Sequence, residues 1–404
     1  MTADAIPWCG RTAALVRPPI AKVAALAAER IQRGEDVIDL GQAILGLQPP
    51  ASFLDGVRDY LRSPTPHVYS PDPGLPAVRD AVAAFTRDHK AIPCDAGQNV
   101  MMTCGANQAF ADALFAVTHP GDEVITFGPG YFDHDYTLAM AGCRQVEVPI
   151  ALHEGRYRFD LDAVDLAITP RTKCVVLVSP GNPTGAVADE FFVRALCERC
   201  ARDGIWILSD ETYDLLTFPP ARHVSPASVA GFDRVAVLGT FSKLFAAAGW
   251  RIGYLAGSVR LIEEAFKVQD ALVICAPVAS QRGLLAALPS IDEYVSAARD
   301  ELGLRRQALV EALAGWGAVE LVVPEGATFG MAGLRDTKDD VGFCEDLLRR
   351  TGVVTVPGSA FGALGAGYAR FSFGNQTVER IRMAGERMAS GQPAAYAAKR
   401  ACKD

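Results

Sequence analysis

The sequence has no long apolar run, no cluster of like charges and no tract of low complexity. A membrane-spanning helix needs about 20 consecutive apolar residues, so we expect none, and no membrane partner. The start of the chain lacks the basic segment and apolar core of a secretory signal, and we therefore expect a cytoplasmic protein. The 47 acidic residues outnumber the 39 basic ones, and the net charge of −8 disfavours binding to nucleic acid.

Motifs that bind metal ions are also missing. The six histidines are scattered and form neither HxH nor HExxH, so we predict no metal site. The ten cysteines lie mostly inside apolar segments, which favours reduced, buried thiols over a disulfide framework. Cys197 and Cys200 form a CxxC in EFFVRALCERCARDG, and we interpret this pair as part of a packed helix, not as a zinc or redox site.

The patterns that are present predict an α/β fold. With 404 residues, half of them hydrophobic, the chain is globular and too long for one ordinary core. Short β-branched runs such as DEVITFG and GIWILSDE alternate with helical stretches, which indicates a mostly parallel sheet between helices. We predict a large domain over residues 51–284. A smaller α+β domain combines 1–50, including a helix over 14–34, with 285–404.

One lysine lies in an unusually apolar segment. Lys243 in GTFSKLFAAAGWRIGYL has almost no neighbour that could solvate or pair its ammonium group. The side chain could reach water from a half-buried loop. Alternatively, burial lowers the pKa of the amine and makes it a nucleophile toward carbonyls. Such a lysine usually forms a Schiff base with pyridoxal phosphate (PLP), and that cofactor needs partners for its phosphate, ring nitrogen, phenolic oxygen and ring face.

The chain offers residues that could bind a phosphate group. An arginine provides a planar fork of donors, two hydroxyls precede the lysine, and the turn TCGANQAF opens a helix whose amides favour an anion. These candidates are Arg251, Thr240, Ser242, Gly105, Ala106 and Asn107.

Candidates for the rest of the cofactor follow predicted strands. Asp210 ends the run IWILSD, where a parallel sheet places ligands, and it could hold the ring nitrogen protonated or cap a helix over DETYDLL. Asn182 and Tyr213 could donate hydrogen bonds to the phenolic oxygen. For the ring face we choose Tyr131 over Phe132, which we expect to pack inward.

Several segments together resemble one family. SPGNPTG, SDETYDLLTF, TFSKLFAAAGWRIGYL and YARFSFG are similar, in this order, to the class I/II aminotransferases of PLP fold type I. The resemblance extends from DVIDLGQ to ERIRMAGERM. It implies a large domain with a mostly parallel seven-stranded sheet and a smaller α+β domain formed by both chain ends.

The resemblance also implies roles. Lys243 resembles the lysine that forms the internal aldimine and moves the substrate's α-proton, Asp210 the pyridinium partner, and Tyr213 and Asn182 the donors to the phenolic oxygen. The phosphate site would comprise Gly105, Ala106, Asn107, Thr240, Ser242 and Arg251, with Tyr131 stacked on the ring. Arg370 resembles the arginine that binds the substrate carboxylate, near Asn182 and the backbone of Gly41. Tyr69 resembles the tyrosine that reaches the phosphate of the other subunit, which implies a homodimer.

Two segments depart from the family pattern. In LGQAILGLQPP, Ile44, Leu45 and Leu47 replace a Pro-Asp-Phe element that borders the substrate, and GATFGMAGL lacks the usual bulkier aromatic residues. We predict an aminotransferase that moves the amino group of an α-amino acid to a 2-oxo acid. The alternative is a non-transaminating PLP enzyme, either a lyase similar to 1-aminocyclopropane-carboxylate synthase, acting on S-adenosylmethionine, or a β/γ-substitution enzyme. A silent module of a DNA-binding regulator is disfavoured, because no helix-turn-helix or basic segment is present.

Overall fold

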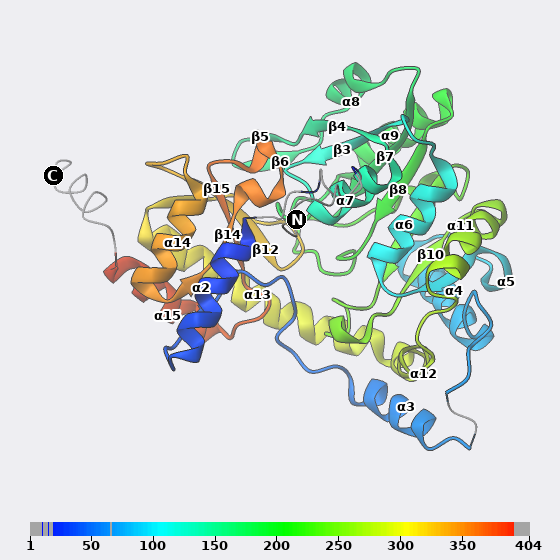
Figure 1. The fold of residues 1–404 in the computed structure, drawn as a ribbon, viewed down its shortest axis with the longest axis horizontal. Coiled ribbons are helices and arrows are strands. Elements are labelled where there is room, and N and C mark those ends of the chain that lie inside the picture. Colours follow the sequence, from blue (N-terminus) through cyan, green and yellow to red (C-terminus); the bar gives the residue numbers. More distant parts are fainter. Residues whose placement is uncertain (1–9, 11–14, 16–18, 65–66, 392–404) are drawn as a thin grey trace, which may run out of the picture.

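A computed structural model describes residue 10, residue 15 and residues 19–64 and 67–391. Its larger part is a sheet between two layers of helices (Figure 1). Within the described residues this sheet has seven strands, as the family resemblance implied. In spatial order they are β2 (Val100–Thr103), β10 (Gly253–Ala256), β9 (Val235–Thr240), β8 (Trp206–Asp210), β7 (Thr172–Val178), β3 (Glu123–Gly128) and β4 (Arg144–Pro149). All run parallel except β10, which is antiparallel to both of its neighbours.

Both faces of the large sheet are buried. In β8, Ile207 belongs to the main hydrophobic core and Leu208 to a second core on the other face, because successive side chains of a strand point to opposite sides. The predicted strand runs are therefore confirmed. Around the sheet lie α4 (Pro76–Lys90), α5 (Ala96–Asn99), α6 (Ala106–Val117), α7 (Phe132–Ala141), α8 (Leu161–Ala167), α9 (Glu190–Asp203), α10 (Pro226–Ala230), α11 (Val259–Leu272) and α12 (Val278–Ala287).

The two ends of the chain meet in a smaller part. β1 (Ile38–Asp39) pairs in parallel with β13 (Val353–Val354), so residues more than 300 positions apart share backbone hydrogen bonds. An antiparallel sheet beside them has the order β11 (Val319–Leu321), β12 (Phe329–Leu334), β15 (Tyr368–Ser372) and β14 (Val356–Pro357). The helices of this part are α2 (Ile20–Gln32), α13 (Ile291–Trp316), α14 (Asp340–Thr351) and α15 (Val378–Ser390). The boundaries of the two domains stay predictions.

Some elements differ from the sequence predictions. The helix predicted over 14–34 is α2, Ile20–Gln32, and part of the predicted range lies outside the described residues. The segment GATFGMAGL contributes β12, one of the two inner strands of its sheet, and the β-hairpin of β5 (Ala151–His153) and β6 (Arg156–Arg158) was not predicted. Helix α3 (Ala51–Leu61) packs on α12 through small residues, since a Cβ on Gly56 would lie 2.7 Å from the Cβ of Ala286.

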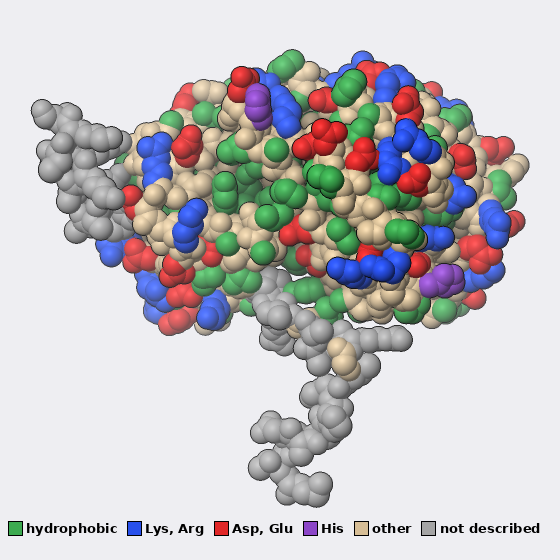
Figure 2. All heavy atoms as spheres, turned by 90° about the horizontal axis from the view of Figure 1, so that it is seen from above, with side chains coloured by type: hydrophobic (Ala, Val, Ile, Leu, Met, Phe, Trp, Pro, Cys, Tyr) green, Lys and Arg blue, Asp and Glu red, His purple; other side chains and the backbone are tan. Residues whose placement is uncertain are grey.

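The cysteines within the described residues are free thiols, and both signs of charge occur on the surface, as the composition predicted. Cys197 and Cys200 lie buried in α9, so the predicted helix is confirmed, and the eight cysteines within the described ranges are free. Acidic and basic side chains are interspersed over the face in Figure 2. Among the described helices, none is long and apolar enough to span a bilayer. In that same part of the chain, no group of three or more potential metal ligands occurs.

Candidate active site

A cavity of about 320 Å³ lies where the parallel strands end, and it faces the smaller part of the molecule. The carboxyl ends of β7, β8 and β9 and the start of α6 form one side, as expected for ligand sites of parallel sheets. Its lining includes most of the predicted site residues: Ala106, Asn107, Tyr131, Asn182, Asp210, Tyr213, Thr240, Ser242, Lys243, Arg251 and Arg370.

Lys243 follows β9 and points into this cavity. Its Nζ donates a hydrogen bond of 2.7 Å to a neutral acceptor, the carbonyl oxygen of Ala43. Burial, together with the nearby charges of Arg370 and Arg251, lowers the pKa of the amine to about 8. Roughly a tenth of the amine is therefore unprotonated at pH 7, far more than for a lysine with an ordinary pKa, and the unprotonated form is the nucleophile.

Asp210 is the last residue of β8 and is buried at the cavity wall. Its Oδ1 accepts hydrogen bonds from the backbone N–H of Thr212 at 3.0 Å and from the hydroxyl of Thr212 at 2.7 Å. No helix begins at this aspartate, so the capping alternative is replaced by a side-chain-stabilised turn. Its Oδ2 lies 3.2 Å from Nε2 of His134.

His134 is a site residue that the sequence analysis missed. It is buried on α7, its ring lies 4.1 Å from that of Phe110, and it meets Tyr131 edge-on at 5.3 Å. A signal was present in GYFDH, because residues three apart at the start of a helix share a face. The expectation that Phe132 packs inward was incomplete, since Phe132 is only half-buried and also lines the cavity.

Arg370 on β15 crosses from the smaller part into the cavity. Its Nη1 donates to Oδ1 of Asn182 at 2.8 Å and its Nη2 to the carbonyl oxygen of Gly41 at 2.6 Å. The guanidinium lies over the rings of Phe329 and Phe361, at 4.9 and 4.8 Å. Burial lowers its pKa to about 10, and its Nε is buried without a hydrogen-bond partner among the described residues. This arrangement leaves donor capacity for an added carboxylate.

The other end of the cavity suits an anion. Gly105 precedes α6 with φ of +88°, and a Cβ there would lie 2.7 Å from Nη2 of Arg251. Arg251 donates to the carbonyl oxygens of Cys104 and Ala248, which holds its guanidinium at the helix start. The hydroxyl of Thr240 donates to that of Ser242 at 2.9 Å. A helix N-terminus, an arginine and two hydroxyls are groups that suit a phosphate group.

The two predicted tyrosines lie in different places, Tyr131 at the cavity and Tyr69 away from it. The Tyr131 ring lines the cavity, and its hydroxyl donates to Oδ2 of Asp133 at 2.5 Å, an oxygen that also accepts from Asn107 at 2.8 Å. Tyr69 is not at the cavity of its own chain. It is 74% exposed and lines a separate hollow between α3 and α12, so its predicted place at another subunit's phosphate stays a prediction.

The segment LGQAILGLQPP, which departs from the family pattern, borders the cavity only in part. Leu45 is buried in the main core and Ile44 is 37% exposed, whereas Ala43 lines the cavity and its carbonyl oxygen accepts from Lys243. From this segment Ala43 lines the cavity, and the carbonyl oxygen of Gly41 accepts from Arg370.

The comparisons with known proteins match this geometry over nearly the whole chain. Residues 35–388 match the profile of the family described as aminotransferase class I and II. The chain belongs to this family. It is 31% identical to an aromatic aminotransferase of Arabidopsis thaliana, over 94% of this chain and 95% of the relative. It is 33% identical to an aspartate aminotransferase of Thermotoga maritima, over 92% and 96%.

Solved structures agree with the family assignment. The aspartate aminotransferase of Thermus thermophilus with maleate has a TM-score of 0.90 at 30% identity, covering 96% of this chain and all of the other. The class I and II aminotransferases depend on PLP, so this chain is a PLP-dependent transferase that acts on amino acids. The relatives named here are aminotransferases, which confirms the predicted function over the non-transaminating alternative.

Proposed function

We propose that Lys243 is the residue of this aminotransferase that holds PLP and carries the proton of the reaction. PLP, when bound, supplies an aldehyde that attaches to amines and a ring that withdraws electrons from the substrate's α-carbon. The single observation that carries this role is a lysine amine in the cavity wall whose hydrogen bond goes to a neutral carbonyl oxygen, and its surroundings lower the pKa to about 8. Whenever Nζ is not bonded to the cofactor, it would accept the substrate's α-proton and return it elsewhere.

The surrounding side chains fit the remaining groups of the cofactor. Asp210, backed by His134, would hold the ring nitrogen protonated, and Tyr131 would cover the ring. Asn182 and Tyr213 would donate to the phenolic oxygen. The phosphate would lie between the start of α6 and Arg251, against the two hydroxyls: Gly105, Ala106, Asn107, Thr240 and Ser242 complete this site.

Arg370 would bind the α-carboxylate of the amino acid. Its Nε lacks a partner, and its terminal nitrogens already bridge Asn182 and the Gly41 carbonyl oxygen. A carboxylate bound by a planar guanidinium is fixed in orientation as well as in position. The substrate's α-carbon is thereby held beside Lys243.

The substrate's side chain would be apolar. The cations that line the described part of the cavity are Lys243, Arg251 and Arg370, and each already has a role. The remaining wall includes Ile20 and Phe132, which pack on the buried cluster around Phe361. A second carboxylate would be buried there without a partner, at a cost of several kcal/mol.

One experiment tests the lysine and the substrate class together. Holoenzyme is mixed with single amino acids and no oxo acid. We expect one oxo acid per active site, formed at least about tenfold faster from leucine, methionine or phenylalanine than from aspartate. Borohydride reduction and peptide mapping should find the cofactor attached at Lys243, and Lys243→Ala should abolish both the attachment and the oxo acid.

A variant separates the substrate class from the reaction itself. Phe132→Arg adds a cation to the apolar wall and should shift the preference toward aspartate, whereas Phe191→Arg on the exposed face of α9 should not. If wild-type enzyme already prefers aspartate, the apolar assignment is wrong while transamination stands. If no amino acid yields an oxo acid, or the cofactor is found at another lysine, the proposed mechanism is wrong.

The working unit would be a homodimer in the cytoplasm. Tyr69 and Val68 are exposed apolar side chains beside α3 and α12, where a second subunit would cover them. Tyr69 would then reach the phosphate site of the partner. The free thiols of the described cysteines fit a reducing compartment.

A further inference from the structure

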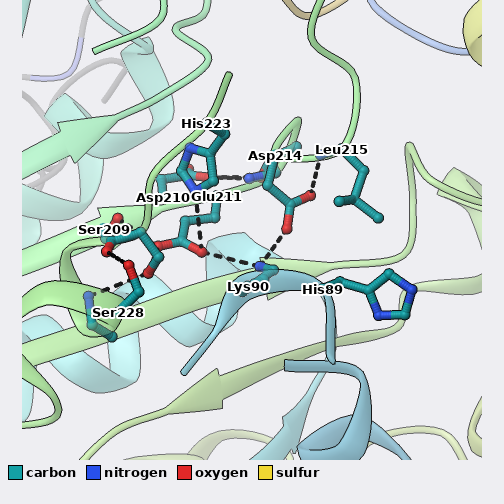
Figure 3. A network of polar contacts seen from close by, with 12 residues as sticks. His89, Lys90, Ser209, Asp210, Glu211, Asp214, Leu215, His223 and Ser228 are labelled. Atoms are coloured by element: carbon teal, nitrogen blue, oxygen red, sulfur yellow. Dashed lines mark hydrogen bonds and ion pairs between the residues drawn. The ribbon is translucent and has the colours of Figure 1, made fainter. Parts of the chain in front are cut away.

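Behind the turn that follows β8 lies a buried group of charges. Lys90, the last residue of α4, has a side chain that is 2% exposed, and those of Glu211 and Asp214 are 0% and 2% exposed. The Lys90 Nζ donates to Oε2 of Glu211 at 3.0 Å and forms an ion pair with Oδ2 of Asp214 (Figure 3). Removing a charge from water costs several kcal/mol per ion, and in this triad the attraction between the ions offsets that cost. Loss of one member would leave the others buried without a partner, so the triad holds the chain in place only while it is complete.

Other side chains complete the shell around the triad. The Nζ also lies over the rings of Phe85 and Tyr254, at 5.7 and 5.4 Å. The second carboxylate oxygen of Glu211 accepts hydrogen bonds from Ser209 and Ser225, at 2.9 and 2.6 Å. His223 Nε2 lies 3.5 Å from Oε2 of Glu211, the same oxygen that accepts from Lys90. Although burial opposes ionisation, Lys90 and His223 hold the pKa of Glu211 well below its usual range.

The two carboxylates flank proposed cofactor contacts. Glu211 follows Asp210, and Asp214 follows Tyr213. At a strand end, neighbouring side chains point to opposite sides, so Asp210 faces the cofactor cavity while Glu211 faces Lys90. The chain between them is a turn without a regular hydrogen-bond ladder. The turn separates the cofactor cavity from a second cavity, about 770 Å³ in volume, which Lys90 and Asp214 line.

We propose that Lys90 is a positioning residue for transamination. By binding the residues next to Asp210 and Tyr213 on one ammonium group, it fixes the separation of these two side chains and their direction toward the cofactor ring. The inference rests on the proposed roles of Asp210 and Tyr213. Misplacing a catalytic group by about 1 Å can cost roughly 100-fold in rate, although the displaced residue itself remains intact.

The test compares Lys90→Met with Lys90→Arg and a matched control. Glu123→Gln also removes a buried charge, one held by Arg171 and Arg144 at the opposite edge of the sheet. For each purified protein we would measure the PLP dissociation constant of the apoenzyme, the pH titration of the bound cofactor's visible absorbance, and the rate of the half-reaction.

Lys90→Met should shift the midpoint of the absorbance titration by about one pH unit and weaken PLP binding. It should also slow the half-reaction roughly 10- to 100-fold. Lys90→Arg should recover most of the loss, and Glu123→Gln should change stability only. A Lys90→Met protein that is less stable but has a wild-type titration and a rate within about twofold would overturn the proposal.

If Lys90→Met does not fold, Asp214→Asn provides the same test. This substitution removes one of the two carboxylates that pair with Lys90 and leaves no carboxylate unpaired. An unchanged titration in that variant would equally overturn the proposal. Failure of the proposed function is distinguishable, since it would be seen in the wild-type enzyme as an absence of cofactor attachment at Lys243.

Discussion

Lys243 and Arg370 show what the cavity does to single cations. Lys243 is half-buried and Arg370 is buried, neither is neutralised by a carboxylate in the geometry described above, and the pKa of each is lowered, to about 8 and about 10. A cation in a medium of low polarity loses hydration energy, which favours the neutral form. For the lysine, the lost hydration increases the fraction of nucleophilic, unprotonated amine. For the arginine, it strengthens the attraction between the guanidinium and a carboxylate.

The pKa of Lys243 makes a stability prediction for the apoenzyme. In the unfolded chain the amine has a pKa of 10.5 and in the folded protein about 8, so between these values the unfolded state binds the extra proton. The folded state is therefore penalised fully below about pH 8, and the penalty disappears as the pH rises toward 10.5. Lys243→Met should raise the free energy of unfolding at pH 7 by roughly 1–3 kcal/mol.

Urea unfolding of cofactor-free protein at several pH values measures this gain, which should shrink between pH 8 and 10. The control is Lys267→Met, an exposed lysine on α11 paired with Glu264, whose effect should stay near zero at every pH. A gain from Lys243→Met that is independent of pH would contradict the lowered pKa.

At the scale of elements, the start of α6 is the most constrained part of the site. The backbone at Gly105 is in a conformation that other residues rarely adopt, and the guanidinium of Arg251 occupies the space where a side chain would begin. The start of the helix is therefore held against the guanidinium of Arg251, at the proposed phosphate site.

Gly105→Ala should weaken PLP binding at least about tenfold, because the added methyl group must displace either the turn or Arg251. Titration of the apoenzyme with PLP measures the loss. The comparison variant is Gly303→Ala in the middle of α13, where no atom lies within 4 Å of the added Cβ. It should stabilise the protein by about 0.5–1 kcal/mol and leave PLP binding unchanged. Equal PLP affinities in the two variants would contradict the proposed phosphate site.

At the scale of the whole molecule, the site depends on parts that are far apart in the sequence. The large sheet supplies Asp210 and Lys243, the strand β15 supplies Arg370, and the segment after β1 supplies the Gly41 and Ala43 carbonyl oxygens. Tyr69 is exposed and lies away from the cavity of its own chain, and its place at a second subunit's site remains our proposal.

Mixing two inactive variants tests whether subunits share sites. In a dimer of one Tyr69→Ala and one Lys243→Ala chain, one site carries both defects and the other carries neither. Unfolding and refolding a mixture should therefore restore about a quarter of wild-type activity per site, if subunits assort at random and each parent is inactive. Each variant refolded alone is the control. Activity no higher than the sum of the two parents would show that Tyr69 does not serve the partner's site.

The sequence by itself determined the alternation of strands and helices, because β-branched runs and helical periodicity are local properties. It also determined the residue types at the strand ends, including Asp210, Asn182 and Lys243. The tertiary structure decided contacts that no local pattern encodes. His134 meets Asp210 across two elements, Ala43 and not Leu45 reaches the lysine, and Lys90 binds residues more than 100 positions away. A buried charge needs a partner, and the packing of the elements decides which residue lies close enough to be that partner.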